Sequence, residues 1–211
     1  MTNLFSTFDP CTGKMSMNWI STMMFIFIIP NKFWKKNNTQ EMMLNLMFKF
    51  INKEMSMNTK YKSIKVMLIT MMMFILINNM MGLLPYVFTS SSHLMFSLSL
   101  SIPMWISYMM FGWKMNTKLM LTNMLPKNTP TLIMPLMIMI ELTSNLIRPY
   151  SLAIRLSANM IAGHLLFSLL GEKNMLMFMI IMLFMMTFEL AVSIIQSYVF
   201  MTLMSLYSSE V

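Results

Sequence analysis

The chain has 211 residues, of which 57% are hydrophobic and 10% are charged, and its mean hydropathy is +0.64. A soluble domain carries about 25% charged residues, so this composition excludes a soluble enzyme and predicts a membrane protein of several helices. The single cysteine, Cys11, excludes an intrachain disulfide, and the two histidines lie far apart in sequence, so we expect no metal and no cofactor.

The positive charge is concentrated in the first third of the chain. Residues 1–65 hold nine lysines and three acids (net +6), whereas residues 66–211 have a net charge of +2. Nucleic-acid binding is the usual alternative reading of a basic segment, but lysines this close to apolar runs set membrane orientation, so we expect no nucleic-acid partner. The 35 methionines indicate an AT-rich organellar genome with a reassigned isoleucine codon. Without a signal or transit peptide, we expect insertion in the compartment of synthesis.

In chain order, the first apolar run predicts a short membrane span over residues 15–29, ended by Pro30. The basic segment 32–65 follows. Within it, residues 41–55 predict an amphipathic helix lying on the membrane surface, with a solvated loop as the alternative. Its apolar residues at helical spacing are Met43, Leu46, Met47, Phe50 and Ile51.

Two further spans are expected over residues 66–88 and 93–113. The first contains Asn78 and Asn79, which we interpret as a hydrogen-bonding contact between helices rather than a catalytic feature. The patterns predict that residues 1–211 form a single all-α membrane domain.

The last two apolar runs are longer than a perpendicular span needs. Residues 131–170 would form a helix of ~60 Å, against a hydrocarbon core of ~30 Å. This run must therefore turn back near Arg148, Pro149 and Tyr150 or lie steeply tilted. Residues 175–206 are also overlong, and together the two runs predict a tilted helical hairpin.

The first of these runs carries a polar stripe through Arg155. Placing an ionisable group at the centre of a membrane costs between ~2.5 and ~17 kcal/mol of free energy, so such a group usually has a function. Such a stripe faces a water-filled path, a partner charge or a bundle interior. A charge paired only for packing is the alternative for Arg155, and Arg148 either lines a channel or extends to the membrane interface. The members of the stripe are Glu141, Asn145, Arg148, Ser151, Arg155 and Asn159.

The last run carries a second polar face, made by Glu189, Ser193 and Gln196. His164 and Glu189 form a natural proton-handling pair, with a static hydrogen-bonded pair as the alternative. Ala162 and Gly163 are expected to permit close helix approach. We also expect Gln196 to hydrogen-bond Arg155. In a symmetric hairpin Glu189, which is as far from the turn as Arg155 is, would lie level with Arg155. The pairing with Gln196 therefore requires the two helices to be offset along their axes.

Several motifs resemble the mitochondrial ATP synthase subunit a family, of an insect type. They are N-L-F-S-T-F-D-P at the start, M-G-L-L-P-Y-V-F-T-S-S-S-H-L in the middle, I-E-x-x-S-N-x-I-R-P-x-x-L-A-x-R-L-x-A-N-M-I-A-G-H from Glu141 to His164, and I-Q-S-Y-V-F near the end. The resemblance covers nearly the whole chain. Asn128 and Tyr150 stand where the family more often has glycine.

The resemblance implies five transmembrane helices plus a surface helix, with the last two helices forming a long, tilted hairpin. It implies a non-catalytic stator subunit of the Fo sector of ATP synthase that provides two offset proton half-channels. The expected partners are the carboxylates of the rotor c-ring, the peripheral stalk, subunit 8 and membrane lipid. The location would be the mitochondrial inner membrane, with the N-terminus in the intermembrane space and the C-terminus in the matrix.

The resemblance also implies roles for single residues. Arg155 would be the essential arginine, His164 and Glu189 would serve the inlet path, and Glu141 the exit path. The expected proton-translocation residues are Arg155, Asn159, His164, Glu189, Gln196 and Glu141. Further candidates for channel lining are Arg148, Ser151, Asn145 and Ser193.

An alternative is a membrane subunit of a respiratory complex or an antiporter-like transporter, which would also be apolar and organellar. That class needs broken helices with lysine and glutamate in repeated halves. This chain has no internal repeat and no lysine inside an apolar run, which disfavours the alternative.

Overall fold

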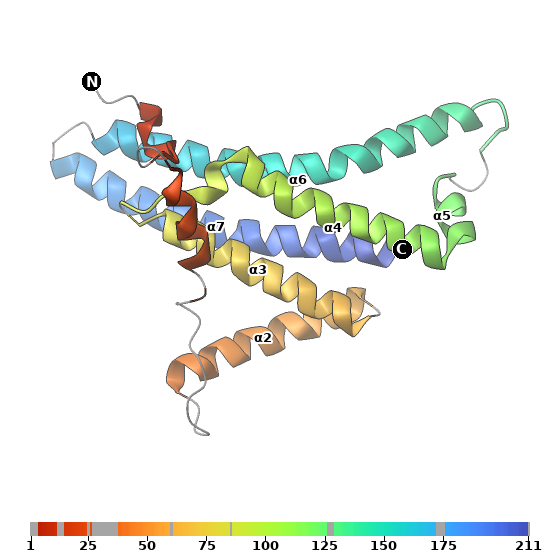
Figure 1. Ribbon diagram of the computed structural model, residues 1–211, viewed down its shortest axis with the longest axis horizontal. Helices are drawn as coiled ribbons and strands as arrows, with labels where there is room; N and C mark the ends of the chain where they lie inside the picture. Colours follow the sequence, from red (N-terminus) through yellow and green to blue (C-terminus); the bar gives the residue numbers. More distant parts are fainter. Residues whose placement is uncertain are drawn as a thin grey trace.

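The computed structural model describes residues 4–11, 15–24, 26, 38–59, 61–84, 86–125, 129–171 and 176–210. Within this part of the chain, every regular element is a helix (Figure 1), so the predicted all-α fold is confirmed. The elements are the short 3-10 helices η1 (Leu4–Phe8), η2 (Met17–Met24) and η3 (Ser90–Ser92) and the α-helices α2 (Thr39–Asn58), α3 (Lys62–Gly82), α4 (Leu94–Met115), α5 (Thr117–Asn123), α6 (Met134–Gly171) and α7 (Leu176–Glu210).

Four of the described helices, α3, α4, α6 and α7, are long and apolar enough to cross a membrane. The fifth expected span, residues 15–29, is described over residues 15–24 and 26 only. There, η2 is a 3-10 helix of 8 residues. At ~2 Å per residue, this helix is too short to cross a hydrocarbon core of ~30 Å. The described residues therefore support four spans, and the rest of the expected fifth span lies outside them.

The long run from residue 131 does not turn back on itself. α6 is one continuous helix of 38 residues with Pro149 inside it, so its length is ~57 Å. Proline lacks an N–H, so the carbonyl of Asn145 loses its usual partner within the helix, yet the helix continues. α7, with 35 residues, runs back beside α6 (Figure 1). The two helices form the expected long hairpin.

The core lies where α3 packs on α7 and α4 packs on α6. Ile75, Met201 and Met204 are completely buried there, beside Leu156 of α6. Because lipid is as apolar as these side chains, such helices are held together by close packing rather than by the hydrophobic effect. Small polar residues assist this approach. The completely buried serines on these helices are Ser97, Ser101, Ser197 and Ser205.

The asparagine pair of α3 is buried but does not make the expected bond between helices. Asn78 Nδ2 donates to the carbonyl of Phe74 in its own helix at 3.0 Å. The side chain of Asn79 is completely buried and has no hydrogen-bond partner among the described residues. Neither asparagine side chain therefore links α3 to a neighbouring helix by a hydrogen bond in the described structure.

α2 is the expected amphipathic helix, but its apolar residues divide into two sets. Ile51 and Met55 pack into the core against α3 and α7. The side of α2 that carries Ile51 and Met55 meets the other helices. Four of the five residues predicted for one apolar face lie on other sides of α2 and are exposed. These four exposed residues are Met43, Leu46, Met47 and Phe50.

Described lysines from both lysine-rich segments lie at one end of the bundle. Lys62 opens α3 and Lys114 lies in the last turn of α4. These helix ends lie at the same end of the molecule as α5 and the C-terminal end of α7, whereas η3, the last turns of α6 and the first turns of α7 lie at the other end (Figure 1). This arrangement agrees with the expectation that both lysine-rich connections share one side of the membrane.

The contact of α2 with α7 can be tested by cross-linking. Asn58 Nδ2 and Ser205 Oγ lie 3.4 Å apart. In a Cys11→Ser background, Asn58→Cys with Ser205→Cys should cross-link with a short bifunctional thiol reagent. The control pair, Asn58→Cys with Ile195→Cys, should not, because Ile195 lies ten residues, or ~15 Å, further along α7. Equal cross-linking of both pairs, read on a gel, would contradict this packing.

Candidate functional site

The polar stripe of α6 does not face a single environment. Glu141, Asn145 and Arg148 line one cavity, and His164 lines another. Asn159 contacts α7, whereas Ser151 and Arg155 are exposed. The site residues predicted from the sequence are thus distributed over two cavities, one contact between helices and one open face.

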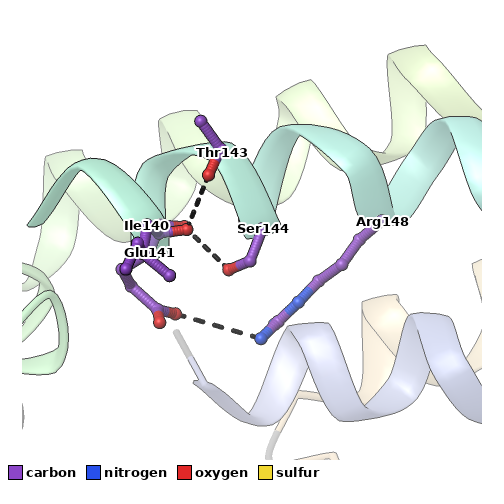
Figure 2. Close-up of polar contacts among 5 residues, drawn as sticks. All are labelled: Ile140, Glu141, Thr143, Ser144 and Arg148. Atoms are coloured by element: carbon purple, nitrogen blue, oxygen red, sulfur yellow. Dashed lines mark hydrogen bonds and ion pairs between the residues drawn. The ribbon is translucent and has the colours of Figure 1, made fainter. Parts of the chain in front are cut away.

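The Glu141 cavity has a volume of about 350 Å³ and is walled by α4, α5, α6 and α7. Arg148 Nη2 lies 4.0 Å from Glu141 Oε1, and Figure 2 shows the two side chains extending toward one another from α6. The Arg148 guanidinium also lies 5.5 Å from the centre of the Tyr207 ring. Arg148 is therefore part of a cavity wall, which favours the channel-lining alternative for this residue. The lining residues are Trp105, Tyr108, Met109, Met120, Asn123, Met124, Glu141, Asn145, Arg148 and Tyr207.

The His164 cavity, of about 650 Å³, lies toward the opposite end of α6. Nε2 of His164 is buried and has no hydrogen-bond partner among the described residues. The imidazole ring meets the ring of Phe8 edge-on, with 6.1 Å between the ring centres. Besides α6 and α7, the wall includes N-terminal residues and the segment between α3 and η3. The lining residues are Ser6, Thr7, Asp9, Asn18, Leu83, Leu84, Tyr86, Val87, Phe88, Thr89, His164, Phe167, Ser168, Met182 and Met186.

A packed stretch of α6 separates the two cavities. Arg148 and His164 are sixteen residues apart, ~24 Å along a helix. The side chains between them that face the bundle are mostly apolar and buried. They include Leu152, Ala153, Leu156 and Met160. The two cavities are therefore separated along α6 by a buried, mostly apolar stretch.

Gly163 of α6 leaves room for a side chain of α7. A Cβ atom at this position would collide with the carboxyl group of Glu189, which is buried. Only glycine leaves this space, so the prediction that Gly163 permits close approach is confirmed. Ala162, the other residue named for that role, is exposed. The Glu189 carboxyl group thus lies against the residue that precedes His164.

The register of the hairpin differs from the expected one. Asn159 Nδ2 donates to Gln196 Oε1 at 3.0 Å, and no hydrogen bond joins Gln196 to Arg155 among the described residues. Glu189 is level with Gly163, eight residues or ~12 Å from Arg155 along α6. The expected pairing of Gln196 with Arg155 is therefore wrong in this structure. The two helices are thus offset in the direction that brings Gln196 to Asn159 rather than to Arg155.

Ser193 joins the hairpin to a third helix. Its hydroxyl lies 3.2 Å from Sδ of Met80 in α3 and also donates to the carbonyl of Leu190 at 2.8 Å. Glu189, Ser193 and Gln196 are all buried. The three residues thus share one face of α7, as the sequence predicts, and that face is directed into the bundle.

Arg155 lies on the face of α6 that this chain leaves uncovered. Its neighbours on that face, Ser151, Ala158 and Ala162, are small and exposed. The ion pair found in the described part of the chain is that of Arg148 with Glu141, and no acidic group of the described residues lies within 4.0 Å of Arg155. A positive charge between small side chains is accessible to a group from outside the chain.

Comparison with known proteins decides the family. The family model described as ATP synthase A chain matches residues 15–209. The chain is 48% identical over 215 residues to the ATP synthase F(0) complex subunit a of Rhopalosiphum padi, with 99% of each chain covered. It is 44% identical to the ATP synthase subunit a of Locusta migratoria and 43% identical to that of Drosophila melanogaster, over essentially the full length of each.

The chain belongs to the ATP synthase subunit a family. The resemblance seen in the sequence motifs is thereby confirmed. As a subunit a, the chain is a membrane-embedded component of the F(0) sector that takes part in proton transport for ATP synthesis.

Sequence reasoning missed two groups that line the cavities of this subunit a. Tyr207 follows Gln196 by eleven residues, about three helical turns, so its place on the polar face could have been found from spacing. Asp9 could not, because it lies in a short segment without periodicity, more than 150 residues before His164.

The contact between Gly163 and Glu189 predicts a specific defect. Gly163→Ala should displace the Glu189 carboxyl group and reduce proton-driven ATP synthesis by up to ~100-fold, the cost of misplacing a reacting group by about 1 Å. Adding Glu189→Asp, which shortens the side chain by one methylene, should restore part of the rate. Gly171→Ala is the matched control, because nothing lies within 4 Å of a Cβ atom there. A normal rate in Gly163→Ala would contradict the contact.

A second prediction concerns Cys11, outside the spanning helices. A hydrogen bond from the thiol to the Asp9 carboxylate, together with the negative charge of that carboxylate, raises the pKa of Cys11. Because the thiolate is the reactive form, Asp9→Asn should lower this pKa and speed alkylation of Cys11 at neutral pH. The rate-against-pH curve should move to lower pH in Asp9→Asn and stay in place in Asp9→Glu. Identical curves for Asp9→Asn and the natural chain would show that the two groups do not interact.

Proposed function

We propose that this chain is the stator subunit that conducts protons past a rotor ring of c subunits, through two half-channels that do not meet. The proposal is carried by one arrangement: two polar cavities at opposite ends of α6, with a packed apolar stretch between them and Arg155 on the open face. A rotary motor needs two aqueous paths separated by a barrier. Protons that reach the middle of the membrane must then pass from this chain to a carboxyl group of the rotor ring.

Arg155 supplies the electrostatic part of the barrier. Arginine suits this role because a guanidinium is a permanent positive charge in proteins and so does not relay protons. An opposite charge within a few ångströms favours the ionised form of an acid, so a rotor carboxylate that passes Arg155 releases its proton before crossing. The small side chains of Ser151, Ala158 and Ala162 allow a partner helix to come close.

The remaining predicted residues divide between the two paths. His164, in its cavity, and Glu189, against Gly163, form the inlet, where each group can accept and release a proton. Glu141, with Asn145 and Arg148 beside it, forms the exit path. The bond between Asn159 and Gln196 joins the hairpin one turn from Arg155 and holds the helix that carries this charge.

The family supports a location in a mitochondrial membrane, and the charge pattern supports an orientation in it. The subunit resides in the mitochondrial inner membrane and has no catalytic site of its own. The lysine-rich end of the bundle and the C-terminus face the matrix, as the positive-inside rule requires, and the N-terminus faces the intermembrane space. Its partners are the c-ring carboxylates, the peripheral stalk, subunit 8 and membrane lipid.

The proposal predicts the effect of removing the charge. Arg155→Ala in the assembled enzyme should reduce coupled ATP synthesis by about 100-fold or more, as when a charge-stabilising group is removed from an enzyme. Passive proton leak through the F(0) sector should persist or increase, because the barrier is lost. Arg155→Lys should also impair coupling, since a buried lysine can lose its proton.

Lys118→Ala provides the matched control. It removes one positive charge from an exposed position of α5 that borders neither cavity, and both ATP synthesis and leak should stay normal. Coupled synthesis that survives Arg155→Ala, measured in membranes with a fixed proton gradient, would refute the proposed function.

A further inference from the structure

The N-terminal segment of the chain forms part of the wall of the His164 cavity. Ser6, Thr7 and Asp9, in or just after η1, line the cavity together with Asn18 of η2. In Figure 1 the red N-terminal ribbon lies across the bundle near the end where α6 and α7 are joined. Part of the wall of the cavity lined by His164 therefore comes from residues far away in the sequence.

Several contacts hold this segment in place. Phe8 meets the ring of His164 edge-on at 6.1 Å. Asn18 Nδ2 donates to the backbone carbonyl of Asp9 at 3.3 Å, which ties the segment to η2. In turn, the Trp19 ring lies 5.6 Å from that of Phe88 and 5.2 Å from that of His93. The segment is thus anchored both to the imidazole it covers and to the turn after α3.

Asp9 is the acidic group in this wall. Among the lining residues described, the groups that can ionise are Asp9, Tyr86 and His164. The Asp9 side chain is exposed, and its Oδ1 accepts a hydrogen bond from the backbone N–H of Cys11 at 3.1 Å. A carboxyl group that faces solvent and also lines the cavity of His164 can exchange protons with the outer solution and with water in that cavity.

We propose that Asp9 is a further proton-transfer residue of the inlet, which collects protons from the outer solution and passes them through cavity water to His164. In each transfer, the Asp9 carboxyl group gives its proton to a water molecule, and that water passes a proton to the imidazole of His164. The carboxylate then takes a new proton from the outer solution. This inference rests on the proposed function, because it assumes that His164 lies on the inlet path.

A turn-forming role is the competing explanation for Asp9, since its carboxylate already accepts the Cys11 N–H. Asparagine makes the same local turn with its side-chain carbonyl but cannot exchange a proton at neutral pH. Asp9→Asn therefore removes the proton-transfer group and keeps the turn, whereas Asp9→Glu keeps the acid. The two variants separate the two explanations.

The experiment measures passive proton conduction through the F(0) sector, and ATP synthesis, in the assembled enzyme in liposomes. Asp9→Asn should reduce both by roughly 3- to 10-fold, less than the ~100-fold of a positioned acid–base group, because water also reaches the cavity directly. Asp9→Glu should restore most of the rate. Ser16→Ala, in the same segment but outside the cavity wall, is the control and should be normal.

The outcomes distinguish failure of the role of Asp9 from failure of the proposed function. Normal conduction in Asp9→Asn, or an equal loss in Asp9→Asn and Asp9→Glu, overturns the role of Asp9 as a proton-transfer residue. If Arg155→Ala abolishes coupling in the same preparation, the proposed function stands even when Asp9 fails. If Arg155→Ala remains coupled, the proposed function fails whatever Asp9→Asn does.

Discussion

The contact between the Gly163 backbone and the Glu189 carboxyl group fixes the register of the hairpin, and most of the site depends on it. With Glu189 level with Gly163, the next polar contact along the antiparallel pair falls between Asn159 and Gln196. One turn further, Arg155 reaches a level where no polar residue of α7 meets it. A hairpin shifted by one turn would place Gln196 beside Arg155 and would partner the charge inside the chain.

The two arginines of the chain show how this arrangement distributes charge. Arg148 has an acid on its own helix, Glu141, and an aromatic ring from α7. Arg155, seven residues later, lies on the uncovered face beside small residues. An ionised group at membrane depth must be paired or hydrated. In the described structure Arg148 is paired within the chain, whereas no acidic group of the described residues lies within 4.0 Å of Arg155.

The sequence predicted α3, α4, α6 and α7 well because their apolar runs are long. It predicted the shared face of Glu189, Ser193 and Gln196, because residues three and four apart on one helix are neighbours. It could not give the register between α6 and α7. Counting residues from the turn gives the register only if the residues at which the two helices end and begin are known. It also could not decide which apolar residues of α2 face inward, since Ile51 and Phe50 differ by one position and are equally apolar.

The two cavities differ in how they are built, and this difference follows from chain topology. The wall of the Glu141 cavity comes from α4 to α7, so each of its residues belongs to a helix packed around it or to the short connection next to one. The His164 cavity lies toward the C-terminal end of α6, where the described wall from α6 and α7 consists of His164, Phe167, Ser168, Met182 and Met186. The chain covers that end with its N-terminal segment, which brings a carboxylate to a histidine that has none on its own helix nearby. A residue without any periodic signal in the sequence thus completes the polar lining at this end.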